Sequence, residues 1–131
     1  MKKIEIKTHL VYLDNQEIIH IDVREGSHVE LGSLQEVHKA CNQLAGNKKK
    51  LVIVDASPHH TMTDEAMDYL KKQMMDKGRL ASAIISENLG VRIMIDYLTN
   101  VLKTQSTVKM FSSEPEAIKW LLGFKNQPVR Y

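Results

Sequence analysis

The sequence is poor in cysteine and has no cluster of glycines. It contains one cysteine, so no disulfide can form within the chain, and its six glycines are isolated rather than gathered in a phosphate-binding turn. No apolar run preceded by a basic start looks like a signal peptide, and none reaches the length of a membrane span. These absences exclude a disulfide-stapled secreted protein and the nucleotide fingerprints of Rossmann and P-loop proteins. A cytoplasmic location is expected.

An excess of charge of one sign is also missing. Lys plus Arg is 18 and Asp plus Glu is 16, so the formal charge of +2 is too balanced for a dedicated binder of nucleic acid or of an anionic membrane. The 131 residues suit one ordinary domain, residues 1–131, with a core from about residue 4 to residue 124. Only two phenylalanines and one tryptophan are present, against seven methionines, which are flexible and line adaptable apolar surfaces.

Two segments of alternating apolar and polar residues open the chain. They cover residues 4–12 and 19–23, and Asp14 and Asn15 between them suit a turn. Alternation of this kind predicts an antiparallel hairpin with one buried face, and His20 is expected on the polar face of the second strand.

Helices and strands alternate after the hairpin. Ser33 and Glu36 have the spacing of a reciprocal N-terminal cap, which predicts a helix from Ser33 to Gly46. Short apolar runs typical of strands covered on both faces occupy residues 51–54, 81–85 and 108–111. Further helices are predicted from Thr61 or Thr63 to Gly78, over residues 89–102, and after Ser113.

This order predicts a single-domain α/β fold. Its mixed β-sheet has an opening antiparallel hairpin and later strands in parallel, and four helices flank the sheet in the order ββαβαβαβα.

The stretch VIVDASPHHTMTDEA, residues 52–66, contains the residue types of a catalytic or metal site. Asp55, Ser57, His59 and His60 follow a buried strand, and α/β folds place their sites at such strand ends. Adjacent histidine side chains diverge on an extended chain, however, and no hydrolase or zinc motif has the required spacing. No catalytic residue, metal or cofactor is predicted, and a hydrolase is the lesser alternative.

The second and third predicted helices carry more apolar surface than one sheet face covers. The residues concerned are Met67, Met74, Ile93, Met94 and Tyr97. Such an excess faces the ordinary core, a second subunit or a ligand cavity. A homodimer is expected, because an isologous contact is the commonest way to cover apolar helices.

The element order, together with a central strand that ends in Asp55-x-Ser57 before a helix, resembles the STAS superfamily of SpoIIAA-like proteins. The resemblance covers residues 4–124, and the wider group includes small bacterial proteins related to the lipid-carrying CRAL-TRIO and Sec14 domains. It implies a non-enzymatic regulatory or protein-interaction module that binds an unidentified partner protein.

In phosphoregulated relatives a serine at the start of the second helix is phosphorylated. The matching turn here is residues 63–66, where both the serine and the glycine of the family's turn are missing. Asp64 and Glu65 already occupy the positive helix start and would repel a phosphate. The phosphorylation switch of these relatives is therefore not expected here. The loop and helix start are predicted to face a partner protein, through Ser57, His59, His60, Thr61, Thr63, Asp64 and Glu65.

The alternative function is a carrier or sensor of a small apolar, lipid-like ligand. Its pocket would lie between the second and third helices, lined by Met67, Met74, Ile93, Met94 and Tyr97. Neither function involves nucleic acid or stable insertion into a membrane.

Overall fold

A mixed sheet of six strands lies at the centre of the protein, in the order β1-β2-β3-β5-β7-β8. The structure is a computed structural model that describes residues 2–46, 48–74, 79–97 and 107–125. The strands of the sheet are β1 (Lys2–Glu5), β2 (His9–Leu13), β3 (Ile18–Val23), β5 (Lys50–Asp55), β7 (Arg79–Ile85) and β8 (Thr107–Phe111). β2 pairs antiparallel with β1 and β3, whereas β5, β7 and β8 extend the sheet in parallel. The predicted α/β fold with its antiparallel start is confirmed.

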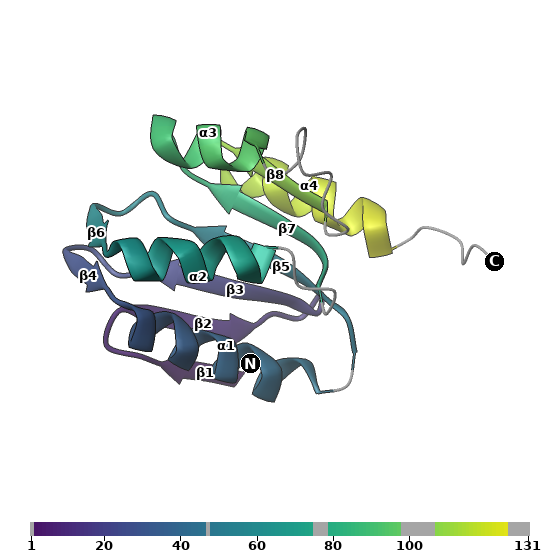
Figure 1. Ribbon diagram of the computed structural model, residues 1–131. Helices are drawn as coiled ribbons and strands as arrows, with labels where there is room; N and C mark the ends of the chain where they lie inside the picture. The colour runs from purple at the N-terminus through teal and green to yellow at the C-terminus, as the bar shows by residue number, and fades with distance from the viewer. Residues whose placement is uncertain (1, 47, 75–78, 98–106, 126–131) are drawn as a thin grey trace.

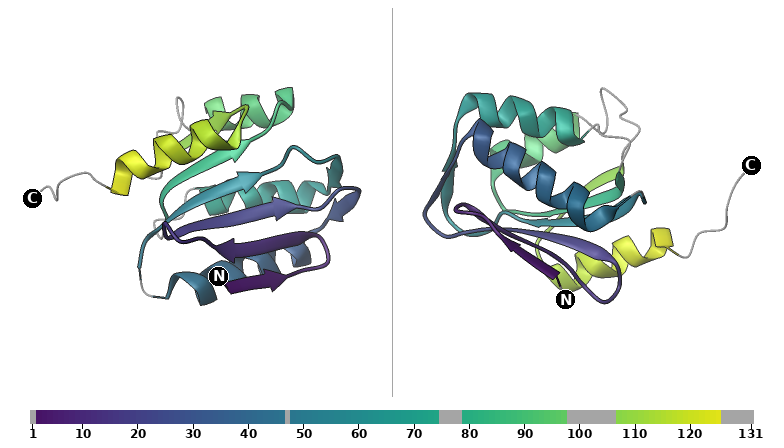
Figure 2. Two further views of the ribbon diagram at one scale, coloured as in Figure 1. Left: turned by 180° about the vertical axis from the view of Figure 1, so that it is seen from behind. Right: turned by 90° about the horizontal axis from the view of Figure 1, so that it is seen from below.

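Helices cover the two faces of the sheet unequally (Figures 1 and 2). α1 (Leu31–Ala45), α2 (Asp64–Met74) and α3 (Leu89–Asp96) lie on one face, and α4 (Glu114–Lys125) lies on the other. Val52 of β5 packs on the α1 side, while Leu51 and Ile53 pack on the α4 side. Both faces of β5 are buried, which is why its sequence is an unbroken apolar run rather than an alternating one.

The opening segment is two strands, not the one that alternation predicted over residues 4–12. The chain reverses after Glu5, where the backbone N–H of Ile6 donates to the carbonyl oxygen of His9 at 2.8 Å. After this turn the odd-numbered residues of β2, rather than the even-numbered ones, point to the core under α1. Val11 joins the core under α1, whereas Tyr12 faces the other side of the sheet and stacks on His20.

α1 begins two residues earlier than Ser33. Its N-cap is Glu30, whose backbone N–H donates to the Ser33 hydroxyl at 3.2 Å. The reciprocal cap therefore joins Glu30 to Ser33 instead of Ser33 to Glu36. Ser33 was predicted as the N-cap, but it is the third residue of the helix, and its hydroxyl accepts the backbone N–H of the N-cap. The helix ends as predicted at Gly46, which has φ 63° and donates its N–H to the carbonyl oxygen of Asn42 at 3.1 Å.

Two short strands that the sequence did not predict form a separate parallel pair. β4 (Ser27–Val29) lies before α1 and β6 (His60–Met62) lies before α2. The pair is extended by bonds from Gly26 N–H to His59 O at 2.6 Å and from Thr63 N–H to Val29 O at 3.0 Å. This pairing joins the starts of α1 and α2, and each strand is too short to show an apolar period.

The later elements match the predicted ones closely. β5, β7 and β8 contain the runs predicted over residues 51–54, 81–85 and 108–111. The described part of the third helix ends at Asp96, so residues 98–102 of the predicted helix lie outside the described residues, as does Gly78.

Two glycines provide a test of the backbone geometry. Gly46 has a positive φ and Gly123 lies within α4, and a Cβ atom at either position would meet nothing within 4 Å. Gly46→Ala should lower the free energy of unfolding by about 1–2 kcal/mol, because alanine is strained at positive φ. Gly123→Ala should raise it by roughly 0.5–1 kcal/mol, since alanine is the better helix former. Urea unfolding measures both changes, and effects of equal sign would contradict the described backbone.

Candidate functional site

A cavity of about 1080 Å³ lies on the face of the sheet that carries α1, α2 and α3. Strands β3, β5 and β7 contribute to its lining together with these helices. The lining is mainly apolar and includes Ile21, Val23, Leu34, Val37, Val54, Met67, Leu70, Ile84, Val91 and Ile93. The site is therefore built around an apolar interior.

Polar residues of the cavity gather where β5 and β7 end. Ser57, His59 and His60 follow β5, and Ser86 and Asn88 follow β7. The carboxyl ends of parallel strands share one edge of a sheet, so the two loops come together. Asn88 is also the cap of α3, because its Oδ1 accepts the backbone N–H of Val91 at 3.2 Å.

The hydrogen bonds of the first loop do not form a hydrolytic dyad. The Ser57 hydroxyl donates to Asp55 Oδ1 at 2.6 Å. His60 uses its Nδ1–H to donate to the carbonyl oxygen of Pro58 at 2.7 Å, and His59 is exposed. Among the described residues, no group of three or more His, Cys, Asp or Glu side chains is arranged to hold a metal ion. The loop contributes a polar rim to the cavity.

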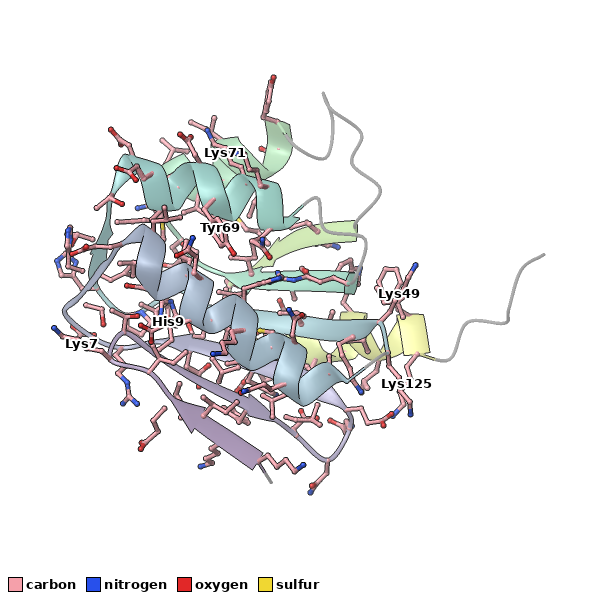
Figure 3. The ribbon with its side chains drawn as sticks, turned by 60° about the horizontal axis from the view of Figure 1, so that its bottom comes forward. Lys7, His9, Lys49, Tyr69, Lys71 and Lys125 are labelled. Atoms are coloured by element: carbon pink, nitrogen blue, oxygen red, sulfur yellow. The ribbon has the colours of Figure 1, made fainter. Side chains whose placement is uncertain are left out.

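His9 of β2 is a buried part of the same site (Figure 3). Its side chain is only 2% exposed, and its Nδ1 forms a hydrogen bond of 2.7 Å with the Thr8 hydroxyl. Burial, with smaller contributions from His60 and Arg24, lowers the pKa of His9 from 6.5 to about 4. The imidazole is therefore neutral at pH 7.

The start of α2 lies beside the cavity rather than in its lining. Thr63 is the N-cap, because its hydroxyl accepts the backbone N–H of Ala66 at 3.1 Å. Thr61, the other predicted cap, lies in β6 and shares a hydrogen bond of 2.6 Å with His28 Nδ1. Asp64 and Glu65 are exposed in the first turn of the helix.

The apolar residues singled out in the sequence fall into two groups. Met67, Ile93 and Tyr97 line the cavity, whereas the side chains of Met74 and Met94 lie outside what the structure describes. Ile93 of α3 is 60% exposed and Tyr97, just after α3, is 50% exposed, so both lie at the edge of the cavity. The structure thus joins two residue sets that the sequence left separate, the loop after β5 and the apolar pocket.

Several lining residues were not singled out in the sequence. They include His9, Tyr69, Lys71, Gln73, Arg79, Ser86 and Asn88. Sites of α/β folds lie at the carboxyl ends of parallel strands, and the end of β5 was considered in the sequence for this reason. The same rule applied to the end of β7 would have found Ser86 and Asn88. Tyr69 and Lys71 come from α2, and Tyr69 lies between α1 and α2 (Figure 3). No local pattern marks these residues, because their positions depend on how α2 is held over the sheet.

A second polar cluster lies on the opposite face of the sheet. Tyr12 stacks on His20 with 4.4 Å between ring centroids, and His20 Nε2 lies 2.8 Å from Asp14 Oδ2. His20 Nδ1 lies 3.3 Å from the Glu114 carboxylate at the start of α4. Burial raises the pKa of Tyr12 to about 12, helped by the nearby carboxylates of Asp22 and Glu114. His20 was expected on the polar face of its strand, but it is buried at 4% exposure, where it contacts Tyr12, Asp14 and Glu114 at the start of α4.

The architecture is that of a SpoIIAA-like fold. The chain superposes on an uncharacterized protein from the DUF3478 family with a SpoIIAA-like fold, from Shewanella loihica PV-4, with a TM-score of 0.62 and 17% identity over 86% of this chain and 91% of the other. A protein of unknown function from Arthrobacter sp. FB24 aligns at 17% identity over 86% and 97% of the two chains, with a TM-score of 0.34.

The family is shown by sequence. Residues 11–125 match the domain of unknown function DUF7793, and the chain belongs to that family. None of the curated proteins matches the chain. Within the described residues, no helix is long and apolar enough to cross a membrane.

His9 makes a testable contribution to acid stability. His9 binds a proton near pH 6.5 in the unfolded state but only near pH 4 in the folded state. The contribution of neutral His9 to the free energy of unfolding is therefore complete above about pH 6.5 and is lost as the pH falls towards 4. The loss should be at most about 3 kcal/mol. In urea unfolding between pH 6.5 and pH 4, the free energy of unfolding should fall less in His9→Gln than in the wild type. The control is His59→Gln at the exposed rim, and equal pH slopes for His9→Gln and the wild type would contradict the assignment.

Proposed function

We propose that this protein is a non-enzymatic binding protein that holds a small apolar ligand in the cavity between α2, α3 and the sheet. The observation that supports this proposal is the cavity itself. Its volume of about 1080 Å³ is slightly above the roughly 300–1,000 Å³ typical of small-molecule sites. Its lining combines a mainly apolar interior with polar groups that gather where β5 and β7 end, an arrangement common in such sites.

The methionine-rich composition supports the same proposal. Met62 and Met67 line the cavity beside Leu70. Methionine side chains adapt to ligands of different shape at little cost, because they are unbranched and polarizable. The acidic start of α2 and the use of the Thr63 hydroxyl as a cap favour recognition by shape over a phosphorylation switch.

A substitution that fills the cavity tests the proposal. Met67→Trp should weaken binding of the neutral apolar dye N-phenylnaphthylamine by about tenfold or more, because the indole occupies the dye's space. Asp68→Trp is the matched control, since Asp68 is an exposed neighbour on α2 that does not line the cavity. Fluorescence titration measures the affinity, and circular dichroism confirms folding. If the dye shows no saturable binding to the wild type, the proposal is wrong.

A second candidate function is the regulatory protein-interaction module, acting as a homodimer. It is favoured by an exposed apolar row along α3 and the residue that follows it, where Leu89, Ile93 and Tyr97 are 69%, 60% and 50% exposed at intervals of four residues. The exposed side chains of Ser57, His59, Thr61, Asp64 and Glu65 would provide a separate polar edge for a partner. A cytoplasmic location belongs to both proposals.

The dimer can be tested at the centre of the apolar row. Ile93→Glu should convert a dimer into a monomer in sedimentation velocity, because a carboxylate on each subunit would be buried in a two-fold contact. Arg92→Glu introduces the same side chain at the exposed neighbouring position and should leave the dimer intact. A wild-type protein that sediments as a monomer up to high concentration would remove this candidate.

A further inference from the structure

A second, smaller cavity lies at the edge of the sheet where β5 and β7 begin. Its volume is about 220 Å³, and its lining includes Ile19 and Val52 of the sheet and Cys41 of α1. Figure 3 shows Lys49 at this edge, between the end of α1 and the start of β5. Among the described residues, the charged members of the lining are all cations: Lys48, Lys49, Lys50 and Arg79. A cavity with this charge suits an anion.

Lys50 is the cation whose position a structural role does not explain. Lys48 and Lys49 are exposed just beyond α1, where cations interact favourably with the negative end of a helix. Lys50, in contrast, is the first residue of β5, is only 8% exposed, and forms no ion pair with a carboxylate of the described residues. Lysine is rarely buried without an anionic partner, because its ammonium group loses hydration. The burial of Lys50 therefore favours an anion that another molecule supplies.

A shift in strand register brings a second cation beside Lys50. Arg79 is its partner on β7, whereas the partner of Leu51 is Ala81, so β7 has one extra residue, Leu80, at this point. Ala81 packs towards α4, and strict alternation would direct Arg79 to the same side, but Arg79 lines the cavity on the α1 side. Neighbouring cations repel each other, and an anion between them offsets that repulsion. Arg79 also interacts within the chain, and a guanidinium has five donors to share.

The small cavity borders the large one. His38 of α1 and Arg79 line both. Glu87 is the one carboxylate in the described lining of the large cavity, and it lies at the opposite edge, after the end of β7. The two cavities together thus form a mainly apolar space with cations at one end, which is complementary to a molecule with an apolar chain and an anionic head group.

We propose that the ligand is an anionic amphiphile, whose apolar chain lies in the large cavity and whose carboxylate or phosphate group binds Lys50 and Arg79 in the small one. This inference rests on the proposed ligand-binding function and adds the chemical class of the ligand. It also assigns Lys50 as the residue that selects an anionic head group over a neutral one.

The experiment measures displacement of N-phenylnaphthylamine from the wild type by decanoate, decanol and decylammonium at neutral pH. An apolar cavity without cations would favour decanol, because moving a carboxylate out of water is costly. In this protein decanoate should bind about tenfold more tightly than decanol, since its carboxylate forms charge-assisted hydrogen bonds with the two cations. Decylammonium, which has the opposite charge, should bind most weakly.

Two lysine variants test the assignment of the head group. Lys50→Met removes the buried charge at similar side-chain length, and should weaken decanoate binding by about tenfold while changing decanol binding by less than about twofold. Retained decanol binding also shows that this variant is folded. Lys39→Met is the matched control, because it removes the same charge from an exposed position of α1 that lines neither cavity. It should keep the preference for decanoate.

Four results would overturn the inference. Decanol could bind the wild type as tightly as decanoate does, decylammonium could bind most tightly, or Lys50→Met could keep the preference for decanoate. The fourth is calorimetric binding of inorganic phosphate that is lost in Lys50→Met, in a wild type without preference for decanoate, which would assign the small cavity to a free anion. Each of these leaves the ligand-binding function standing because the dye still binds.

Failure of the dye itself to bind the wild type overturns both proposals. The ligand series in the wild type does not depend on any variant folding.

Discussion

The parallel pairing of β4 with β6 is the constraint on which the rest of the site depends. It joins the loops that precede α1 and α2, and the hydrogen bond from Thr63 N–H to Val29 O continues it to the start of α2. Leu34 and Ala66 then pack around Val29, so α2 is anchored to α1 at its first turn. A helix held in this way lies over the sheet beside the ends of the central strands, and residues of α2 and of the loops after β5 and β7 line the cavity there.

The two faces of the sheet use polar residues differently. On the α4 face, His20 contacts Tyr12, Asp14 and Glu114, and so connects strands to helix. On the cavity face, His9 is 2% exposed and forms a hydrogen bond with the Thr8 hydroxyl. Its lowered pKa keeps the imidazole neutral, so it adds no buried charge to the apolar interior.

Much of the fold could be predicted from the sequence, because local signals and core patterning agree over most of the chain. The apolar run of β5, the glycine at the end of α1 and the threonine cap of α2 act within a few residues. The predicted antiparallel hairpin is present, but the single strand predicted over residues 4–12 was wrong, because alternation cannot reveal the turn after Glu5 that reverses its phase. The cavity brings Met67 together with His59 and Ser57, and no spacing along the chain encodes that meeting.

The sequence by itself determined the order of helices and strands, the parallel sheet and the absence of a phosphorylatable serine at the start of α2, since each depends on residue type and near-neighbour spacing. Only the tertiary structure decided where α2 sits and that the loop after β5 and the apolar helices border one space. The physical reason is that a cavity is what the packing leaves unfilled, and packing joins residues that are far apart in the chain.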